Sequence, residues 1–401
     1  MKLYKKHISD LGKVITGKTP RTSILENYGG KIPFLTPSDN LSEKFSPTTS
    51  KTLTKIGLNE VKNCLLPSKS ICVSCIDSDL GKVVLTKKPT VTNQQFNSIV
   101  PNEENDADFI YYLMTVVGKH LNYLSKTSTA VPIINKSTFA NYEIEIPNIK
   151  EQKRIGEILS SLDDKIELNR RINDNLEQQA QALFKSWFVN FEPFKKGKFI
   201  DSELGMIPEG WQVEELGNIT NSITEKVGKR TDVKVLSPVN TGDLLLSEEY
   251  FTKQVYSKTL AKYIMVAPND FAYNPARINI GSIGMNTFDF SGCVSPVYVV
   301  FRCEKEYHHF FNIFKATKNF KEEVNTRAIG GVRQTLSYKD FSLIKIVYPP
   351  KEAVEQFNKI YSHIMTLIKK NVLENKRLHQ TRDTLLPKLM SGELKINDIN
   401  N

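Results

Sequence analysis

Apolar residues recur at alternating steps of four and three along residues 155–187, which predicts a long amphipathic helix with a coiled-coil seam. The same pattern returns over residues 357–389, 202 positions further along the chain. The duplicated seam indicates an internally repeated chain. The first seam comprises Ile155, Leu159, Leu162, Ile166, Asn169, Asn173, Leu176, Ala180, Leu183 and Trp187, and the second comprises Phe357, Tyr361, Ile364, Ile368, Asn371, Asn375, Leu378, Arg382, Leu385 and Leu389.

Two asparagines interrupt each seam at equivalent places near its middle. A buried asparagine costs stability unless it finds a partner, so it fixes the register of a helix pair. Parallel and antiparallel pairing could both match these positions, and we favour the antiparallel pair because it gives the chain a pseudo-twofold axis with a globular half at each end. Two helices that each cover only their own domain would not explain the match. The register positions are Asn169, Asn173, Asn371 and Asn375.

A stretch of short strand-like segments, rich in Val, Ile and Thr and separated by turn residues, precedes each long helix. A helix is predicted within the first stretch near 106–124, with Asp106 or Asp108 as its N-cap. Its counterpart in the second stretch is residues 310–324. Six such segments recur in the same order at offsets of about 200 to 205, which supports duplication with small insertions.

The pattern therefore predicts an α+β protein in which two globular domains of mixed short strands and helices are joined by two long helices forming an antiparallel coiled coil. Pro387 is expected at the frayed end of the second helix. The predicted order is a first globular domain over 1–148, a helix over 149–190, a connector without periodicity over 191–210, a second globular domain over 211–350, and a second helix and tail over 351–401.

Composition narrows the class of protein. A chain of 401 residues is longer than one core usually serves, and 40% hydrophobic with 24% charged residues is typical of a soluble globular protein. Neither an apolar run long enough to span a membrane nor an export signal is apparent, and the five cysteines are an odd number, so we expect reduced thiols in a cytoplasm. The single CxxC pair, Cys72 and Cys75, lacks a second pair, so no metal site is predicted.

The net charge of +10 fits either a solvated basic surface or a polyanionic partner such as nucleic acid. Phosphate contacts position a protein and base-edge contacts specify the sequence, so the candidates are polar loops between strands. Arginine is the commonest bidentate reader of guanine, and glutamine can pair with adenine. The candidate DNA-binding residues are Lys18, Thr19, Arg21, Ser38, Gln94, Gln95, Lys126, Thr127, Ser128, Lys136, Lys229, Arg230, Arg277, Asn279, Arg327, Arg333 and Gln334.

Three catalytic motifs were considered and none is supported. Residues 12–19 match the phosphate-loop pattern GxxxxGK[ST], but a polar segment precedes them and a turn-like segment follows, whereas the motif needs a strand and a helix. Asp39 and Glu60 resemble part of a nuclease site, yet the second copy has no counterpart. The tripeptide at 274–276, Asn-Pro-Ala, lacks the second proline and the aromatic residue of a methyltransferase loop. No catalytic residue is therefore predicted.

Several segments, taken together, resemble one known family over essentially the whole chain. They are LGKVITGKTP (11–20), YGGKIPFLTPSDN (28–40), TNQQFNSIVP (92–101), EQKRIGEILSSLDDKIELN (151–169), LFKSWFVNFEP (183–193), IPEGW (207–211) and RDTLLPKLMSGEL (382–394). The chain resembles the specificity subunit of type I restriction-modification systems.

The resemblance implies two target-recognition domains that each read one half of a split DNA site, separated by an antiparallel coiled coil. It also implies two modification subunits that methylate adenine with S-adenosylmethionine they hold themselves, and two motor-nuclease (restriction) subunits that use ATP and Mg²⁺. This chain would bind no cofactor and catalyse nothing. Because the loops differ between the copies, the target should be asymmetric. The alternative is a stand-alone DNA-binding regulator, which would not need the long helices; a DNA mimic would be acidic.

Overall fold

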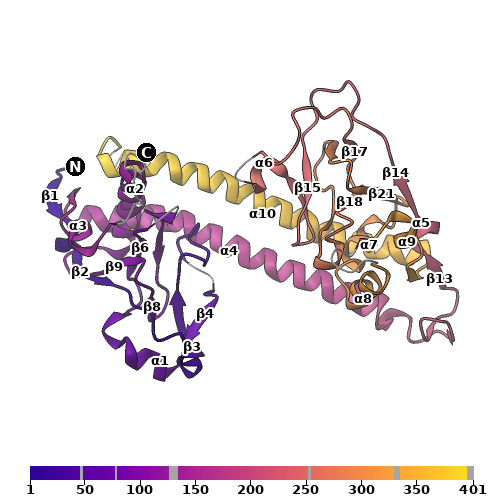
Figure 1. Ribbon diagram of the computed structural model, residues 1–401, viewed down its shortest axis with the longest axis horizontal. Coiled ribbons are helices and arrows are strands. Elements are labelled where there is room, and N and C mark those ends of the chain that lie inside the picture. Colours follow the sequence, from indigo (N-terminus) through magenta and orange to yellow (C-terminus); the bar gives the residue numbers. More distant parts are fainter. Residues whose placement is uncertain (46–47, 77–78, 126–133, 252–253, 329–334, 395–401) are drawn as a thin grey trace. The chain divides into compact units, whose positions relative to one another are not determined.

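The computed structural model divides the chain into two compact units, each containing a globular part and segments of both long helices (Figure 1). Unit 1 comprises Met1–Arg171 and Asn371–Asn401, and unit 2 comprises Ile172–Lys370. The structure describes residues 1–401 except 46–47, 77–78, 126–133, 252–253, 329–334 and 395–401.

Two four-stranded sheets form the globular part of unit 1. The first is antiparallel throughout, and helix α2 (Ala107–Ser125) packs its apolar face against strands β6 and β7 of this sheet. The second contains one parallel pair, between β3 and β8. In spatial order the first sheet is β2 (Gly12–Thr16), β9 (Phe96–Pro101), β6 (Ile71–Ser74) and β7 (Val83–Leu85), and the second is β4 (Lys51–Leu53), β3 (Tyr28–Leu35), β8 (Thr90–Thr92) and β5 (Leu65–Leu66).

Unit 2 repeats the first of these sheets strand for strand, which confirms the duplication. Its order is β14 (Thr220–Ile223), β21 (Val299–Cys303), β18 (Phe271–Tyr273) and β19 (Ile283–Met285). The second sheet returns as two antiparallel pairs, β15 (Leu236–Pro238) with β16 (Leu244–Leu246) and β17 (Ile264–Val266) with β20 (Gly292–Val294). A parallel bridge between Val235 and Cys293 joins the two pairs, as the parallel pair β3–β8 joins the corresponding strands of unit 1.

In each unit the first strand of the globular part pairs with the last one. Strand β1 (Tyr4–His7) pairs with β10 (Glu143–Ile146) in unit 1, and β13 (Gln212–Glu215) pairs with β22 (Lys345–Tyr348) in unit 2. The last strand of each pair leads directly into a long helix. The remaining short helices are η1 (Ile8–Leu11), η2 (Leu25–Asn27), α1 (Lys55–Glu60), η3 (Lys62–Cys64), α3 (Lys136–Ala140), α5 (Leu216–Ile219), α6 (Ser247–Tyr250), η6 (Ile278–Ile280) and α9 (Tyr338–Ser342).

The helices inside the globular parts differ from one another. Asp106 caps α2, because its Oδ1 atom accepts the Phe109 N–H at 2.8 Å. In unit 2 the single helix predicted over 310–324 is wrong, since the segment forms α7 (His308–Phe314) and α8 (Lys318–Arg327). Thr317 explains the break: its hydroxyl accepts the Phe320 N–H at 3.3 Å and starts a new helix.

The long helices, α4 (Ile149–Phe188) and α10 (Lys351–Ser391), lie antiparallel within each unit (Figure 1). In unit 1, Asp163 contacts Arg382 and Asn169 contacts Asn375, so residue numbers rise along one helix as they fall along the other. In unit 2, Asn173 bonds to Ile368 and the Phe184 ring contacts Phe357. The antiparallel prediction is confirmed within each unit.

Two details of the helices differ from expectation. Pro387 lies inside α10, which continues to Ser391 rather than fraying at the proline. The connector is also structured: η5 (Glu192–Phe194) and a hairpin of β11 (Phe199–Ile200) with β12 (Ile207–Pro208) lie against Trp211 through Phe191 and Phe194. Among the described residues, no helix is sufficiently long and apolar to span a membrane.

Candidate nucleic-acid interface

Three of the loops predicted for DNA contact converge in unit 1 at one end of its two sheets. The Lys18 N–H donates to the Thr92 carbonyl at 2.9 Å, and the Thr19 hydroxyl donates to Gln94 Oε1 at 2.7 Å. The Asn93 N–H donates to the Leu35 carbonyl at 3.1 Å, which joins the loop after β8 to the end of β3. Ends of strands from both sheets therefore present one set of polar side chains.

Close backbone packing holds this set in place. A Cβ atom on Gly17 would lie 2.2 Å from the Asn93 carbonyl oxygen, so only glycine permits this approach. The buried Asn97 side chain accepts the Thr16 hydroxyl at 2.6 Å and donates to the Ile134 carbonyl at 3.1 Å. Asn97 thus ties the ends of β2 and β9 to the residue that follows the segment 126–133.

The other predicted residues of unit 1 are exposed to different extents. Arg21, Ser38 and Lys136 are exposed, whereas Gln95 is half-buried and its N–H donates to Asn93. The Arg21 N–H donates to Glu60 at 3.0 Å, and this hydrogen bond is the main reason that the pKa of Glu60 is below its ordinary value. Glu60 places one negative charge beside an otherwise basic loop.

Unit 2 presents an equivalent loop cluster with different side chains. The Leu336 N–H donates to the Pro275 carbonyl at 3.1 Å, as the Ile134 N–H donates to the Cys75 carbonyl at 3.0 Å in unit 1. Arg277, just beyond Pro275, is exposed. The same type of backbone contact therefore supports the corresponding loop in both copies.

Two further predicted side chains lie on adjoining elements. Asn279 is exposed on η6, against which helix α8 packs, and Arg327 ends that helix. Arg327 is half-buried and pairs with Glu323 at 3.0 Å, so a phosphate would have to compete with this carboxylate.

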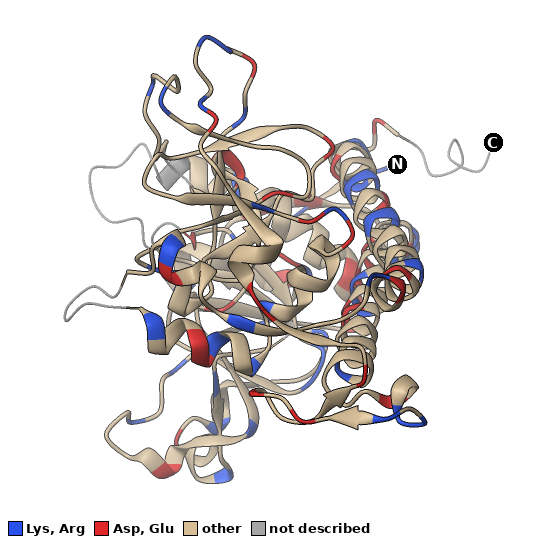
Figure 2. Cartoon of the chain, turned by 90° about the vertical axis from the view of Figure 1, so that its right-hand side faces the viewer, with Lys and Arg blue, Asp and Glu red and all other residues tan. Residues whose placement is uncertain are grey.

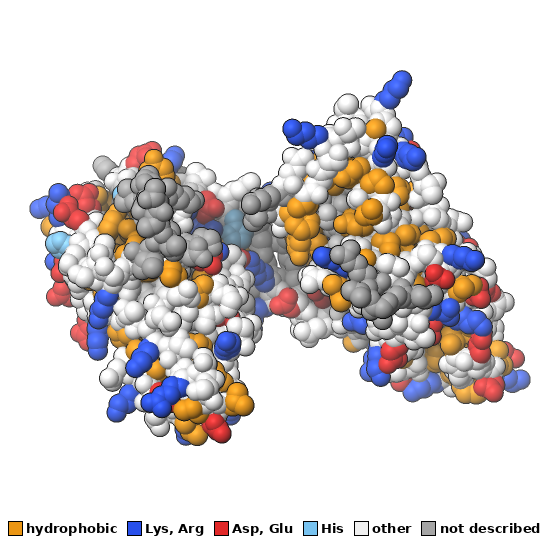
Figure 3. All heavy atoms as spheres, in the orientation of Figure 1, with side chains coloured by type: hydrophobic (Ala, Val, Ile, Leu, Met, Phe, Trp, Pro, Cys, Tyr) orange, Lys and Arg blue, Asp and Glu red, His pale blue; other side chains and the backbone are white. Residues whose placement is uncertain are grey.

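Lys229 and Arg230 lie in the loop that follows β14, as Lys18 follows β2 in unit 1. Both are exposed, and Arg230 pairs with Glu225 at 2.8 Å beside an open hollow of about 570 Å³. Figure 2 marks Lys and Arg residues on loops of the globular parts and along the helices, and in the view of Figure 3 the basic side chains are spread over the surface of each unit.

Five predicted residues lie outside the described residues. They follow α2 in unit 1 and α8 in unit 2, and the described structure resumes at Ile134 and Thr335. Ile134 and Leu336, which lie at or next to these points, carry the equivalent backbone bonds described above. The five residues are Lys126, Thr127, Ser128, Arg333 and Gln334.

Comparisons with known proteins agree with this geometry. Residues 2–178 match the model of the type I restriction modification DNA specificity domain. Over 98% of this chain and 94% of the relative, the sequence is 29% identical to the type I restriction enzyme MjaIX specificity subunit of Methanocaldococcus jannaschii. The HindI specificity subunit of Haemophilus influenzae is 38% identical over 42% of this chain and 38% of its own length.

The fold has a counterpart among solved structures. The crystal structure of a type I restriction-modification S subunit from M. genitalium aligns with a TM-score of 0.59 at 16% sequence identity, and covers 97% of this chain and 96% of that one.

Residues 2–178 thus match a DNA specificity domain, and the chain is similar over nearly its whole length to a type I specificity subunit. These likenesses connect the chain with DNA-sequence recognition in a restriction-modification system.

The thiols, the phosphate-loop pattern and the potential metal ligands of the chain are consistent with a binding role. Burial raises the pKa of Cys72 to about 12 and the pKa values of Cys75 and Cys293 to about 11, so these thiols are not nucleophilic thiolates at neutral pH. Residues 12–16 of the phosphate-loop pattern form strand β2, paired with β9, rather than a cradle before a helix. Within the described ranges, no group of three His, Cys, Asp or Glu side chains could hold a metal ion.

The four asparagines predicted to set the register lie at seam positions of α4 and α10. Asn169 donates to Asn375 Oδ1 at 2.8 Å, and Asn375 donates back to the Ile166 carbonyl at 3.3 Å. Asn173 is buried and donates to the Ile368 carbonyl at 3.4 Å, while Asn371 is half-buried. Two of the four predicted residues therefore bond directly to each other.

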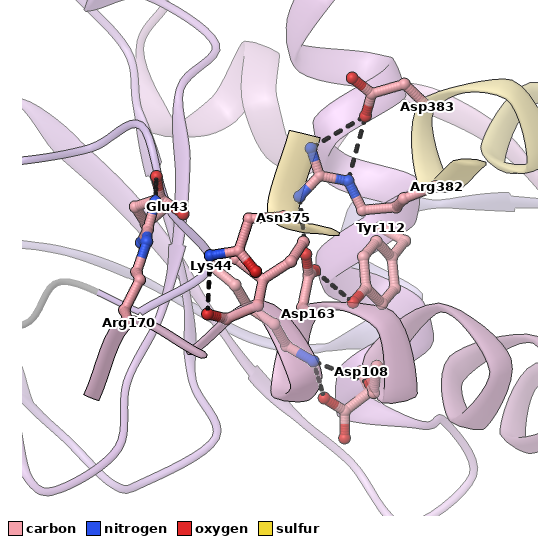
Figure 4. A network of polar contacts seen from close by, with 11 residues as sticks. Glu43, Lys44, Asp108, Tyr112, Asp163, Arg170, Asn375, Arg382 and Asp383 are labelled. Carbon is pink, nitrogen blue, oxygen red and sulfur yellow. Dashed lines mark hydrogen bonds and ion pairs between the residues drawn. The ribbon is translucent and has the colours of Figure 1, made fainter. Parts of the chain in front are cut away.

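Sequence reasoning missed a cluster of buried charges in unit 1, which we call the polar joint: Lys44, Asp108, Tyr112, Asp163 and Arg382 (Figure 4). Lys44 Nζ lies 2.6 Å from Asp108, and Asp163 accepts both the Tyr112 hydroxyl at 2.5 Å and Arg382 Nη1 at 2.6 Å. One signal was present in the sequence, because Arg382 is a charged residue at a seam position.

Burial and charge oppose each other in the polar joint. Burial would raise the pKa of Asp108, but hydrogen bonds from Lys44 and Lys69 hold it below its ordinary value. Burial would likewise lower the pKa of Arg382, yet the neighbouring Asp163 carboxylate raises it above its ordinary value. The charged forms therefore persist because each has a partner.

Proposed function

We propose that this chain is a non-catalytic specificity subunit that reads an asymmetric bipartite DNA site and that each globular part recognises one half. The observation that carries the proposal is that equivalent loops of the two units present different side chains. The loop after β2 carries Lys18 and Thr19 in unit 1, and the loop after β14 carries Lys229 and Arg230 in unit 2. Different side chains on the same support favour different half-sites.

Within each half-site some residues would contact phosphates and others would contact base edges. Lys18, Arg21 and Lys229 have the long basic side chains that neutralise phosphates, which positions the domain without reading sequence. Arg277, Thr19 and Gln94 are the better candidates for base edges, because the guanidinium of Arg277 offers paired donors and the side chains of Thr19 and Gln94 offer both a donor and an acceptor. Arg230 and Arg327 would first have to exchange their carboxylate partners for DNA.

The long helices would set the spacer between the half-sites and carry the partner subunits. We propose two modification subunits, which flip and methylate one adenine in each half-site with S-adenosylmethionine of their own, and two restriction subunits, which use ATP and Mg²⁺. This chain would then contribute placement only, in the cytoplasm of a bacterial or archaeal cell. The hydrogen bonds that asparagines make between α4 and α10 support a helix pair of one fixed register.

The test is a methylation map. The chain is produced with its modification subunit in a host without other adenine methylation, and methylated adenines are located across the genome. We expect one bipartite motif with a single spacer length. A chain that neither binds the modification subunit nor directs methylation to a motif would contradict the proposal, and sequence-specific binding by the chain alone would favour the regulator.

Matched variants in the two units then show which unit recognises which half-site. Arg277→Ala should weaken methylation about tenfold or more and relax a position in one half-site, since a bidentate base contact contributes about 1–3 kcal/mol. Gln94→Ala is the matched variant in unit 1, because Gln94 is the corresponding base-edge candidate there, and it should relax a position in the other half-site only. Relaxation of both half-sites by one variant would contradict independent reading.

A further inference from the structure

The polar joint connects the globular part of unit 1 to both long helices. Lys44 comes from the loop between β3 and β4, and its side chain is only 3% exposed. Its ammonium group donates to Asp108 on α2 at 2.6 Å and to Ser160 on α4 at 2.8 Å. A loop lysine is thus inserted between a helix of the globular part and a long helix (Figure 4).

A second buried charge continues the connection to α10. The Asp163 side chain is 7% exposed and lies on α4. It joins Tyr112 on α2 to Arg382 on α10, at 2.5 and 2.6 Å respectively. Three helices and one loop therefore meet through charged groups with defined directions.

The second copy closes the corresponding place with apolar residues. At the offset of 202, the counterparts of Asp108, Tyr112, Asp163 and Arg382 are Phe310, Phe314, Met365 and Ala180. All four counterparts belong to, or pack against, the main hydrophobic cluster of unit 2. The duplication thus kept the position of the joint and changed its chemistry.

The two chemistries respond differently to small shifts. Apolar contact is non-directional, so side chains can slide past one another at little cost. A buried ion pair needs specific distances and angles, and a shift leaves a charge buried without its partner. The polar joint therefore favours a single seating of the globular part of unit 1 on the helices.

We propose that Lys44, Asp108, Asp163 and Arg382 are positioning residues that hold the first recognition domain in one seating on the helix pair and thereby restrict the spacer length that the complex accepts. This inference rests on the proposed function. None of the four residues needs to touch DNA, because each acts through the orientation of the domain that does.

The test replaces Tyr112, Asp163 and Arg382 by the residues of the second copy and leaves the pair of Lys44 with Asp108 in place. The triple variant Tyr112→Phe, Asp163→Met and Arg382→Ala is assembled with the modification subunit and offered a plasmid library. In this library the two half-sites are separated by the native spacer or by spacers one or two base pairs longer or shorter. The ratio of methylation at altered spacers to methylation at the native spacer is measured by sequencing.

We expect this ratio to rise about tenfold in the triple variant, the scale at which contacting residues commonly couple. Arg382→Lys keeps the charge but loses the planar fork, so it should give a smaller rise and serves if the triple variant does not fold. Lys351→Met is the matched control, because Lys351 also links a long helix to a globular part, through an exposed ion pair with Glu306 at 2.8 Å.

The outcomes distinguish the positioning role of the polar joint from the proposed DNA-reading function. An unchanged ratio in both folded joint variants would overturn the positioning role while leaving the proposed function intact. An equal rise in Lys351→Met would also overturn it, because any weakening of a domain contact would then suffice. Absence of motif-specific methylation by the wild-type complex would overturn the proposed function and this inference with it.

Discussion

The polar joint of unit 1 and its counterpart in unit 2 occupy the same place in a duplicated fold but use opposite chemistry. In unit 2 the counterparts Ala180 on α4, Phe310 and Phe314 on α7 and Met365 on α10 lie in one hydrophobic cluster with Phe184, Phe188 and Phe357. We call this cluster the aromatic joint. The Phe188 ring centroid lies 5.0 Å from those of Phe310 and Phe357. In unit 1 the same helices meet through Asp163 and Arg382.

The two joints differ in what they contribute: aromatic contacts mainly stabilise the fold, whereas the ion pair mainly restricts its geometry. Burying aromatic side chains gains free energy from apolar area and from ring contacts, whose offset-stacked and edge-to-face geometries restrict the side chains less than an ion pair does. A buried ion pair roughly balances its desolvation cost, so its net stabilisation is small, but removing one partner is costly. We therefore expect the aromatic joint to contribute more to the free energy of unfolding, and the polar joint to be less tolerant of single substitutions that leave a charge.

The largest effect is expected from Phe357→Ala in the aromatic joint. Phe357 is fully buried and contacts four aromatic rings, so its truncation should lower the free energy of unfolding by about 3–5 kcal/mol. Urea unfolding of the full chain measures the change, and Phe357→Leu should cost clearly less. A loss below about 1 kcal/mol would show that the joint is not well packed.

Asp163→Asn should have the next largest effect, about 2–3 kcal/mol, because it leaves the Arg382 guanidinium without its main counter-charge. The double variant Asp163→Met with Arg382→Ala should recover most of this loss, since it removes both charges and uses the residues of the second copy. A double variant as unstable as the sum of its single variants would contradict the comparison.

A pH series should detect Lys315, a half-buried lysine of unit 2. Its ammonium group donates to the Gly242 carbonyl at 2.6 Å, and burial lowers its pKa to about 8. Because the folded pKa is below the unfolded value of 10.5, the unfolded chain binds the extra proton between them, and stability rises with pH. The rise should be about 1 kcal/mol between roughly pH 7.5 and 9.5, after allowance for partial exposure.

Lys315→Met provides the control for this series, because it should remove that rise. The measurement is the urea midpoint at each pH, converted to a free energy of unfolding. An equal rise in Lys315→Met would assign the pH dependence to other groups.

The smallest effect is expected at the rim of the polar joint. Lys87 pairs with Glu167 at 3.0 Å, and its side chain is about half exposed. Lys87→Met should change the free energy of unfolding by no more than about 0.5 kcal/mol, because exposed ion pairs are screened by solvent. A change as large as that of Asp163→Asn would mean that burial does not separate the two kinds of ion pair.

Much of the fold could be predicted because it depends on local patterns. The seam period gave both long helices and their pairing, and the repeated segments gave the duplicated sheet. The predicted helix over 310–324 failed because one hydroxyl, that of Thr317, competes with the helix for a backbone donor. The extended connector was missed because its order comes from ring contacts between residues far from any periodic pattern.

The candidate interface was predictable in kind but not in detail. Residue type and loop position pointed to Lys18, Thr19 and Gln94, and the structure brings these loops together. Sequence could not show that Arg230 and Arg327 already have carboxylate partners, or that Asn97 ties the loops to the sheet, because these contacts join residues from different elements.

The sequence by itself determined that the chain is duplicated, that each copy leads into a long helix, and that polar seam positions set the register of the pair. These properties follow from periodicity, which acts between near neighbours. Only the tertiary structure decided how the two copies differ at their joints. Lys44, Asp108, Asp163 and Arg382 are scattered over more than three hundred positions, and their charges become a single network only after burial removes the water that would otherwise screen them.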